Sequence, residues 1–192
     1  MNGMIIVLSG PSGAGKGRTY DEIAKVRKNV RKVLSLTSRT RREEDMNKDN
    51  YVFVSKEEFL LRVANGEFFE YEWYDDNLYG TLNVPVEELK ERDLFFDKDV
   101  RGAISIKKAY PEAITIYIMP KDKETLCKRR GNRGKNREQI SKDEIELAKQ
   151  LDFLVINDDI NQTVKQIEAI IECMRTNSMK NKANMQFMDE FY

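Results

Sequence analysis

Residues 9–19 read SGPSGAGKGRT, and this short stretch decides the fold of the chain. It follows MIIVLSG at residues 4–10, a continuous apolar run typical of a buried parallel strand, and it leads into a helical pattern from Lys16 to about Asn29. Its glycines and Lys16 have the spacing G-x-x-x-x-G-K. Between a strand and a helix, that spacing lets backbone N–H groups and the positive end of the helix hold phosphate oxygens. We therefore predict a phosphate-binding loop in preference to an ordinary glycine-rich turn.

The hydroxyl group that usually ligates Mg²⁺ directly after the lysine is missing, because Gly17 stands there. Two arrangements stay open: Thr19 ligates the ion, or phosphates and water hold it. Arg18 either adds a positive charge beside the phosphates or points to solvent. No residue is therefore assigned to the metal.

Short apolar runs alternate with helical segments in the second half of the chain. The strands are expected at residues 94–97, 114–120 and 153–158, and the helices at about 101–110, 123–130 and 162–175. Strands that alternate with helices indicate a parallel sheet with helices on both faces. We predict a three-layer α/β fold of the P-loop NTPase type.

The middle of the chain has a different pattern. Residues 33–39, 51–55 and 69–81 indicate an antiparallel meander with a hairpin around residues 75–77, and one helix at residues 56–64 interrupts it. A strand-rich insertion in an α/β frame suggests a mixed-β lobe that carries a second substrate. Residues 176–192 lack a sustained period and are predicted to form a flexible tail.

Composition limits the possible partners. The 33 Lys and Arg residues balance the 33 Asp and Glu residues, so no overall field favours nucleic acid or an anionic membrane. The apolar runs are too short to span a bilayer, and the N-terminus lacks a secretory leader. Cys127 and Cys173 each lie in a predicted helix, as expected of reduced thiols in the cytoplasm. The chain has no histidine, so any catalysis uses Lys, Arg, Asp, Glu and backbone groups, which suffice for phosphoryl transfer.

Further motifs follow the loop in a fixed order. They are SLTSRTRRE at residues 35–43, Tyr51, NGEFFE at 65–70, YGT at 79–81, DKDVRGA at 97–103, PKD at 120–122 and VINDD at 155–159. Together with the loop they resemble guanylate kinases over residues 4–175. The loop by itself would indicate only a broad superfamily, whereas the ordered set is specific.

This resemblance implies a role for each matching residue. Lys16, Arg39, Arg129 and Arg133 would be catalytic, with Mg²⁺ accompanying ATP. The ATP-binding residues would be Gly10, Pro11, Ser12, Gly13, Ala14, Gly15, Lys16, Gly17 and Arg18. The GMP-binding residues would be Ser35, Arg39, Arg42, Tyr51, Glu70, Tyr79, Thr81 and Asp99. In this set the two arginines and two tyrosines would hold the GMP phosphate, while Ser35, Glu70 and Thr81 would read the guanine edge.

Each acceptor-site residue also has a simpler interpretation. In that interpretation Arg39 and Arg42 belong to a solvated basic stripe opposite the acids that follow them. The tyrosines are by default packing residues of strands, and Glu70 is by default the solvent face of a strand. Asp99 is by default a helix cap. The phosphate-binding loop elsewhere in the same chain favours the functional interpretation of all of them.

Three departures from the family pattern bear on activity. After Arg42, Glu44, Asp45 and Lys48 take places that usually hold glycine, glutamate and glycine, and Arg18 replaces a small hydroxyl residue. The lid keeps Arg129 and Arg133, but it is shorter by roughly seven residues, about two helical turns. Asp143 stands where a third arginine is expected. An arginine that stabilises a phosphoryl-transfer transition state contributes ~10³–10⁵ in rate, so a reduced rate is predicted unless Arg18, Arg130 or Arg137 compensates.

The prediction as a whole is a cytoplasmic nucleoside monophosphate kinase that transfers the γ-phosphate of ATP to GMP. Residues 1–34, 82–125 and 146–175 form its P-loop core, residues 35–81 the GMP lobe and residues 126–145 the short helical lid. It is expected to be a monomer or homodimer without nucleic-acid or membrane partners. Two alternatives stay open: a non-catalytic guanylate-kinase-like binding module, and a kinase of another small phosphate ester.

Overall fold

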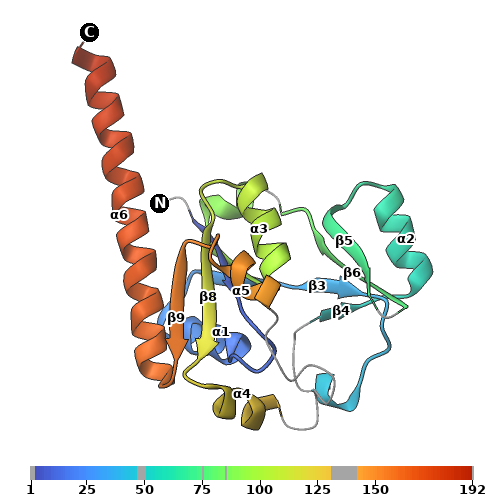
Figure 1. The fold of residues 1–192 in the computed structure, drawn as a ribbon. Helices are drawn as coiled ribbons and strands as arrows, with labels where there is room; N and C mark the ends of the chain where they lie inside the picture. The colour runs from blue at the N-terminus through green and yellow to red at the C-terminus, as the bar shows by residue number, and fades with distance from the viewer. Residues whose placement is uncertain (1–2, 47–50, 75, 85, 131–141, 192) are drawn as a thin grey trace.

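A computed structural model describes residues 3–46, 51–74, 76–84, 86–130 and 142–191. The described chain forms two sheets (Figure 1). The larger is fully parallel and has the order β2-β7-β1-β8-β9. Its strands are β1 (Ile5–Ser9), β2 (Val30–Val33), β7 (Asp93–Asp97), β8 (Ile114–Pro120) and β9 (Phe153–Asn157). The predicted α/β class and its parallel sheet are confirmed.

Helices cover both faces of this sheet, and the alternation of side chains along β1 explains why. Ile6 and Leu8 pack in a core with α1 (Lys16–Val26) and α6 (Ile160–Phe191). Ile5 and Val7 point the other way, into a core with α3 (Val100–Ala109). Because both faces of a parallel strand are buried, the strand appears in the sequence as an unbroken apolar run.

The smaller sheet has the order β4-β3-β6-β5 and belongs to the inserted segment. Its strands are β3 (Ser35–Thr37), β4 (Tyr51–Phe53), β5 (Phe68–Tyr74) and β6 (Asn77–Leu82). The helix α2 (Lys56–Ala64) packs on it through Phe59, which is fully buried against Leu36 and Leu78. Short 3₁₀ turns occur at Glu43–Asp45 and Val86–Lys90, and α4 (Lys123–Arg130) and α5 (Lys142–Ala148) complete the described elements.

Two expectations about the middle of the chain were wrong. The single strand predicted at residues 33–39 is two strands in different sheets, since β2 pairs with β7 and β3 pairs with β6. The predicted mixed-β lobe is confirmed, but it is not the antiparallel meander that was expected, because β3 pairs with β4 in parallel. Residues 38–50 join β3 to β4, and a connection of this length is long enough for parallel pairing. The helix at Lys56–Ala64 comes only after β4.

The end of the chain also differs from the prediction. Helix α6 continues to Phe191, although a helix ending near Arg175 and then an irregular tail were expected. Residues 176–192 contain neither glycine nor proline and are rich in good helix formers, so helix is a favourable backbone conformation even without an apolar stripe. In Figure 1, α6 runs beside β9 and its C-terminal end extends past the rest of the chain. No helix within the described ranges is both long and apolar enough to cross a membrane.

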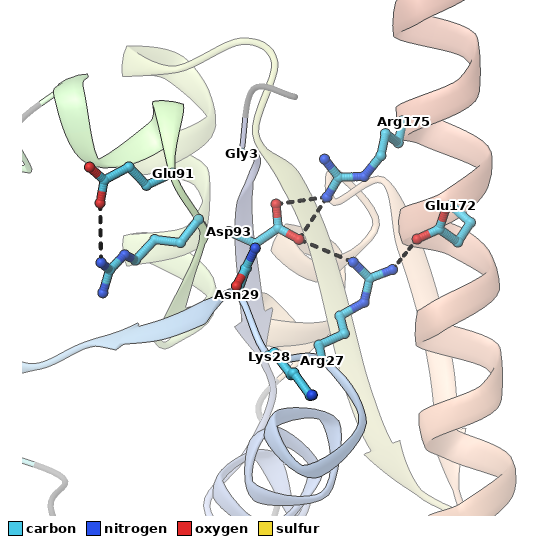
Figure 2. A pocket seen from close by; sticks show the side chains of 9 residues that line it. Gly3, Arg27, Lys28, Asn29, Glu91, Asp93, Glu172 and Arg175 are labelled. Atoms are coloured by element: carbon cyan, nitrogen blue, oxygen red, sulfur yellow. Dashed lines mark hydrogen bonds and ion pairs between the residues drawn. The ribbon is translucent and has the colours of Figure 1, made fainter.

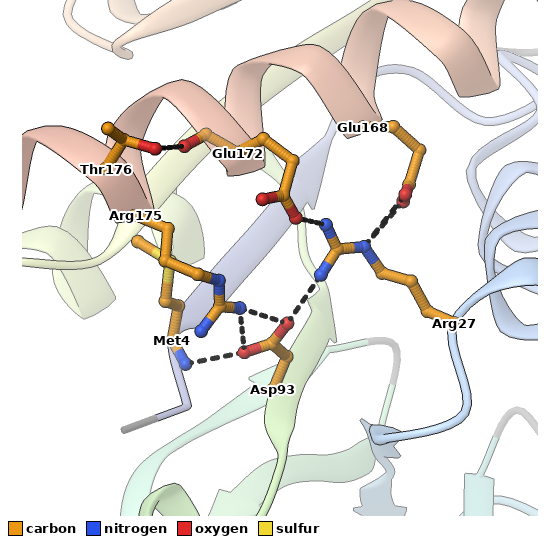
Figure 3. Close-up of polar contacts among 7 residues, drawn as sticks. All are labelled: Met4, Arg27, Asp93, Glu168, Glu172, Arg175 and Thr176. Atoms are coloured by element: carbon orange, nitrogen blue, oxygen red, sulfur yellow. Dashed lines mark hydrogen bonds and ion pairs between the residues drawn. The ribbon is translucent and has the colours of Figure 1, made fainter. Parts of the chain in front are cut away.

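Ionic contacts fasten α6 to the amino-terminal edge of the sheet. A hollow of about 300 Å³ lies there, next to Gly3, Asn29 and Asp93 (Figure 2). The Asp93 carboxylate accepts from Arg175 at 2.7 Å, from Arg27 at 3.2 Å and from the Met4 N–H at 2.9 Å (Figure 3). Arg27 also contacts Glu168 and Glu172 of α6. The charges around this hollow are thus largely satisfied by one another, which makes it a structural junction.

Candidate active site

A larger cleft of about 1520 Å³ opens at the carboxyl ends of the parallel strands. In open α/β sheets this is the edge where ligands bind. The phosphate-binding loop lies along it, together with the residues that follow β7 and β9. Ser35 and Tyr51 of the smaller sheet line the same cleft as Lys16. Of the predicted acceptor-site residues, Ser35, Tyr51 and Asp99 thus line one cleft with the loop, and Glu70, Tyr79 and Thr81 lie beside them in the smaller sheet rather than on the cleft lining.

The loop has the tight backbone that its glycines suggest. Gly15 has φ +99°, and a Cβ atom there would lie 2.4 Å from Nδ2 of Asn157. That nitrogen donates to the Ala14 carbonyl at 2.8 Å, and Asn157 is only 4% exposed. The side chain of Asn157, at the end of β9, therefore binds the loop and leaves no room for a side chain at position 15, where glycine is required.

Lys16 lies at the inner side of the loop. Its Nζ donates to the Gly10 carbonyl at 2.7 Å and is 3.6 Å from Oδ1 of Asp97, at the end of β7. Gly10 is required because a Cβ there would lie 2.2 Å from the Ile118 carbonyl oxygen. The ammonium group is thus held at the edge of the cleft between a carbonyl and a carboxylate.

The side chains near the loop limit how Mg²⁺ is held. Thr19 is fully buried, and its hydroxyl finds no hydrogen-bond partner among the described residues, so it does not reach the cleft. Gly17 offers space but no ligand atom. Within the described ranges, no three acidic or cysteine side chains cluster as a metal site. Arg18 is exposed and lines the cleft. These residues suit an ion held mainly by phosphates and water, with the Asp97 carboxylate as the nearest acid to Lys16.

Strand register aligns the predicted base-reading residues in one row. Ser35 pairs with Tyr51 on one side and with Thr81 on the other, and Thr81 pairs with Glu70. The Thr81 hydroxyl donates to Oε1 of Glu70 at 2.7 Å. Four strands therefore present hydroxyl and carboxylate oxygens side by side. Lys98, which was not assigned from the sequence, joins them through its ammonium group, 2.7 Å from the same Glu70 oxygen.

The predicted phosphate-binding residues lie at one end of this row and in the row next to it. Tyr79 pairs with Thr37, and its ring lies 5.9 Å from that of Tyr51. The Arg39 guanidinium is 5.8 Å from the Tyr51 ring. Burial raises the pKa of Tyr51, so its hydroxyl stays a hydrogen-bond donor at neutral pH. Arg39, Tyr51 and Tyr79 are therefore clustered as expected.

Arg39 is held by a partner that the sequence did not identify. It makes a two-pronged contact with Asp45, at 2.9 Å and 3.2 Å, and both side chains are about 10% exposed or less. Asp45 also accepts from the backbone N–H of Arg42 at 2.8 Å. The bond from Arg39 lowers the pKa of Asp45, and the same bond raises the pKa of Arg39. Arg42 is exposed, beside this pair. The ion pairing anticipated in the simpler interpretation is therefore present, but in a buried position next to the tyrosines.

Asp99 has the capping role that was its simpler interpretation. Its Oδ1 accepts from the Gly102 N–H at 2.7 Å at the start of α3, and the residue also lines the cleft. Of the two lid arginines, Arg129 donates to the Asn157 carbonyl at 3.2 Å and lies on the cleft. Arg133 lies outside the described residues.

Three site residues were missed in the sequence, and each had a weak signal. Asp45 lies in the loop that departs from the family pattern, Lys98 lies inside the quoted DKDVRGA motif, and Asn157 lies inside VINDD. Their position in those segments was a reason to examine them. Their contacts join residues far apart in the chain, which no local pattern reveals.

The fold and the cleft define a class: an α/β protein with a phosphate-binding loop and a second, mixed sheet facing the loop across one cleft. The guanylate kinase family model matches residues 2–174. The chain belongs to the guanylate kinase family.

Individual relatives agree with that assignment. The chain is 36% identical to guanylate kinase of Clostridioides difficile (strain 630), over 95% of this chain and 91% of that protein. It is 38% identical to guanylate kinase of Rickettsia prowazekii (strain Madrid E), over 90% and 92%. The crystal structure of guanylate kinase from Anaplasma phagocytophilum is similar to it with a TM-score of 0.72 and 28% identity, covering 90% of this chain and 86% of that one.

Proposed function

We propose that the protein transfers the γ-phosphate of ATP to GMP, giving ADP and GDP. The observation that carries the proposal is the shared cleft, in which the loop with Lys16 faces the row containing Ser35 and Tyr51. A phosphate donor and a phosphate acceptor bound at these two places would meet in the space between them. Family membership supports the same reaction.

On the donor side, the loop from Gly10 to Arg18 binds the ATP phosphates. Lys16 exchanges its contacts with the Gly10 carbonyl and Asp97 for phosphate oxygens, and Arg129 approaches from α4. Positive charge at the transferring group lowers the barrier because phosphoryl transfer depends mainly on positioning and charge stabilisation. Mg²⁺ would be held mainly by the ATP phosphates and water, near the Asp97 carboxylate, and would supply positive charge that neutralises the phosphates.

On the acceptor side, Arg39, Tyr51 and Tyr79 bind the GMP phosphate, with Arg42 at the rim. Guanidinium groups match phosphate with two parallel hydrogen bonds, and Asp45 orients that of Arg39 in advance. Ser35, Glu70 and Thr81 read the guanine edge, and Asp99 holds the start of α3 beside them. No general base is needed because the GMP phosphate is already an anionic nucleophile.

The lid supplies the remaining part of the proposal. We assign it to residues 126–145, the GMP lobe to residues 35–81 and the core to the rest of the chain up to residue 175. Closure of the lid excludes water, which would otherwise accept the phosphate. Arg129 and Arg133 act on the transferring phosphate, and the absent third arginine lowers the rate.

Location and assembly belong to the same proposal. Cys127 and Cys173 are exposed thiols and do not form a disulfide, which suits a reducing compartment, so the protein is assigned to the cytoplasm. It acts as a monomer or homodimer on small nucleotides.

The reaction is tested with purified protein, ATP and Mg²⁺ in an assay coupled to ADP formation. GMP is compared with dGMP, AMP and UMP, and Lys16→Ala is the control for contaminating kinases. We expect turnover with GMP that Lys16→Ala lacks, and GMP affinity that Lys16→Ala retains by calorimetry. GMP binding without turnover would identify the binding module instead, and preference for another ester would identify a different acceptor.

A further inference from the structure

The position of Lys98 links the two sheets at the base-reading row. Lys98 follows β7 directly, and its backbone N–H donates to the Leu8 carbonyl at 3.1 Å, which fixes it to the end of β1. Its side chain crosses to the smaller sheet and is only 10% exposed. A residue of the parallel core thus reaches the acceptor side of the cleft.

The Lys98 ammonium contacts the three residues assigned to the guanine edge. Its Nζ is 2.7 Å from Oε1 of Glu70 and 3.0 Å from Oγ of Ser35, and it also donates to the Thr81 hydroxyl. A lysine ammonium has three N–H donors. All three are therefore directed at the row that receives the base, and any base that binds Glu70 meets this ammonium.

The neighbouring helix leaves a path for this side chain. A Cβ atom at Gly102 would lie 3.3 Å from both Cβ and Cδ of Lys98. That separation is tighter than ordinary side-chain contact, so a larger residue at 102 would push the lysine aside. Glycine in the first turn of α3 thus allows the extended path of Lys98 into the row.

We propose that Lys98 is a specificity-determining residue that reads the 6-oxo group of the acceptor purine. The proposal rests on GMP being the acceptor. Guanine presents a carbonyl oxygen at position 6, next to an N–H at position 1 and an amino group at position 2. Glu70 accepts from the two N–H groups, and the Lys98 ammonium beside it exchanges its bond with Ser35 or Thr81 for one to the carbonyl oxygen.

The same pair of charges rejects adenine. Adenine carries an amino group at position 6 and a bare nitrogen at position 1. Its amino group would face the ammonium and its nitrogen lone pair would face the carboxylate, so both buried charges would lose a hydrogen bond. A site whose polar groups are left unpaired by the wrong base discriminates strongly. An ordinary ion pair between the two sheets would instead leave base preference unaffected when Lys98 is replaced.

The test compares Lys98→Met with the wild-type protein, and Lys108→Met, an exposed lysine of α3, is the matched control. Affinity is measured by calorimetry, and KM and kcat by the coupled assay. The ligands are GMP, IMP, AMP and the monophosphate of 2-aminopurine riboside, which has no 6-oxo group. IMP keeps the 6-oxo group and the N–H at position 1 but lacks the 2-amino group. ATP affinity serves as the check that each variant is folded.

For Lys98→Met we expect GMP and IMP to bind about 10- to 100-fold more weakly, as for loss of a hydrogen bond to a charged group. The 2-aminopurine nucleotide should change by less than about threefold, and AMP should bind no more weakly because the ammonium that opposes its amino group is gone, so that the GMP preference collapses. The kcat at saturating GMP should change little, and Lys108→Met should match the wild type. Lys98→Gln, which keeps an N–H donor, should bind GMP more tightly than Lys98→Met.

Several outcomes would overturn the inference. Tighter GMP binding by Lys98→Met would make Lys98 a competitor of the base, and equal losses for all four nucleotides would make it a structural tie. If Lys98→Met does not fold, Lys98→Gln alone is compared with the wild type. An unchanged preference of Lys98→Gln for GMP over the 2-aminopurine nucleotide then decides against the inference. Failure of wild-type protein to bind any purine monophosphate would reject the proposed function itself.

Discussion

Replacing Asp93 by alanine removes the carboxylate at which two arginines from different elements meet. Arg27 follows α1 and Arg175 lies on α6, and both are 16% exposed, while the Asp93 side chain is 6% exposed. The substitution also leaves the Met4 N–H without its bond of 2.9 Å. We therefore expect Asp93→Ala to loosen the attachment of α6 to the sheet.

The magnitude follows from the burial of these charges. Removing one partner of a buried ion pair costs about 3–5 kcal/mol, because the other charge stays buried. Arg27 keeps Glu168 at 2.8 Å and Glu172 as partners, which places the expected loss near the lower end, about 3 kcal/mol. For a domain of this size that corresponds to a fall in Tm of about 6–12 °C.

The assay is urea unfolding followed by circular dichroism, with Glu91→Ala as the control. Glu91 lines the same hollow, but its pair with Arg92 is exposed, at 71% for Glu91, so its removal should change the unfolding free energy by less than ~0.5 kcal/mol. Kinase activity well below Tm should be the same for both variants, because the junction lies at the opposite edge of the sheet from the cleft. Equal midpoints for the two variants would refute the reasoning.

Three further predictions concern the loop, the acceptor site and the response to acid. Gly15→Ala should weaken ATP binding at least ~10-fold in calorimetry, because the backbone there is left-handed and a Cβ atom would clash with Asn157. The control Gly66→Ala, at a residue with φ +67° and open space around it, should leave ATP binding unchanged. Equal effects of the two substitutions on ATP binding would contradict the prediction. Asp45→Asn should raise the KM for GMP about 10-fold and leave the KM for ATP unchanged in steady-state kinetics, since Arg39 loses its orienting charge; an unchanged KM for GMP would count against it. Burial acts to raise the pKa of Asp152, but hydrogen bonds from Thr115 and Lys107 outweigh it and lower the pKa. The stabilisation of the fold by the Asp152 carboxylate is therefore present above pH ~3.9 and lost as the pH falls. Asp152→Asn should flatten the acid side of a curve of unfolding free energy against pH. An unaltered acid side would argue against this.

Local sequence patterns correctly predict those elements whose formation depends on neighbouring residues alone. The run at residues 4–10 became β1, and the expected bounds of α2, α4 and β8 match the structure, because apolar periodicity and end signals act within a few residues. The loop conformation was likewise implied by its glycines. The split of residues 33–39 between two sheets was not, since Leu34, which separates β2 from β3, is an apolar residue and gives no turn signal. The change of sheet follows from the separate partners β7 and β6.

The candidate site shows the same limit. The residues that match family motifs could be named in advance, but the groups that orient them could not. Lys98 lies between two acidic residues in the sequence, and nothing local indicates that it reaches Glu70, 28 positions away. For α6, the sequence after Arg175 lacks an apolar stripe and so predicts no helix, but an apolar stripe and a helical backbone are separate properties.

Three cations of the proposed site, Lys16, Arg39 and Lys98, share one arrangement that bears on catalysis. Lys16 faces Asp97, Arg39 faces Asp45 and Lys98 faces Glu70, so that each positive group is held in place by an acid of the same chain. Such partners fix the direction of a charge before the ligand arrives, which reduces the reorganisation needed during reaction. These acids also compete with the ligand for the cation, so each ligand must bind the cation more strongly than a single carboxylate does. A phosphate, with two charges and several oxygens, does so at Lys16 and Arg39. A neutral base cannot displace Glu70 from Lys98 by charge and must instead bind both members of that pair, which explains why base selection would depend on Lys98 as much as on Glu70.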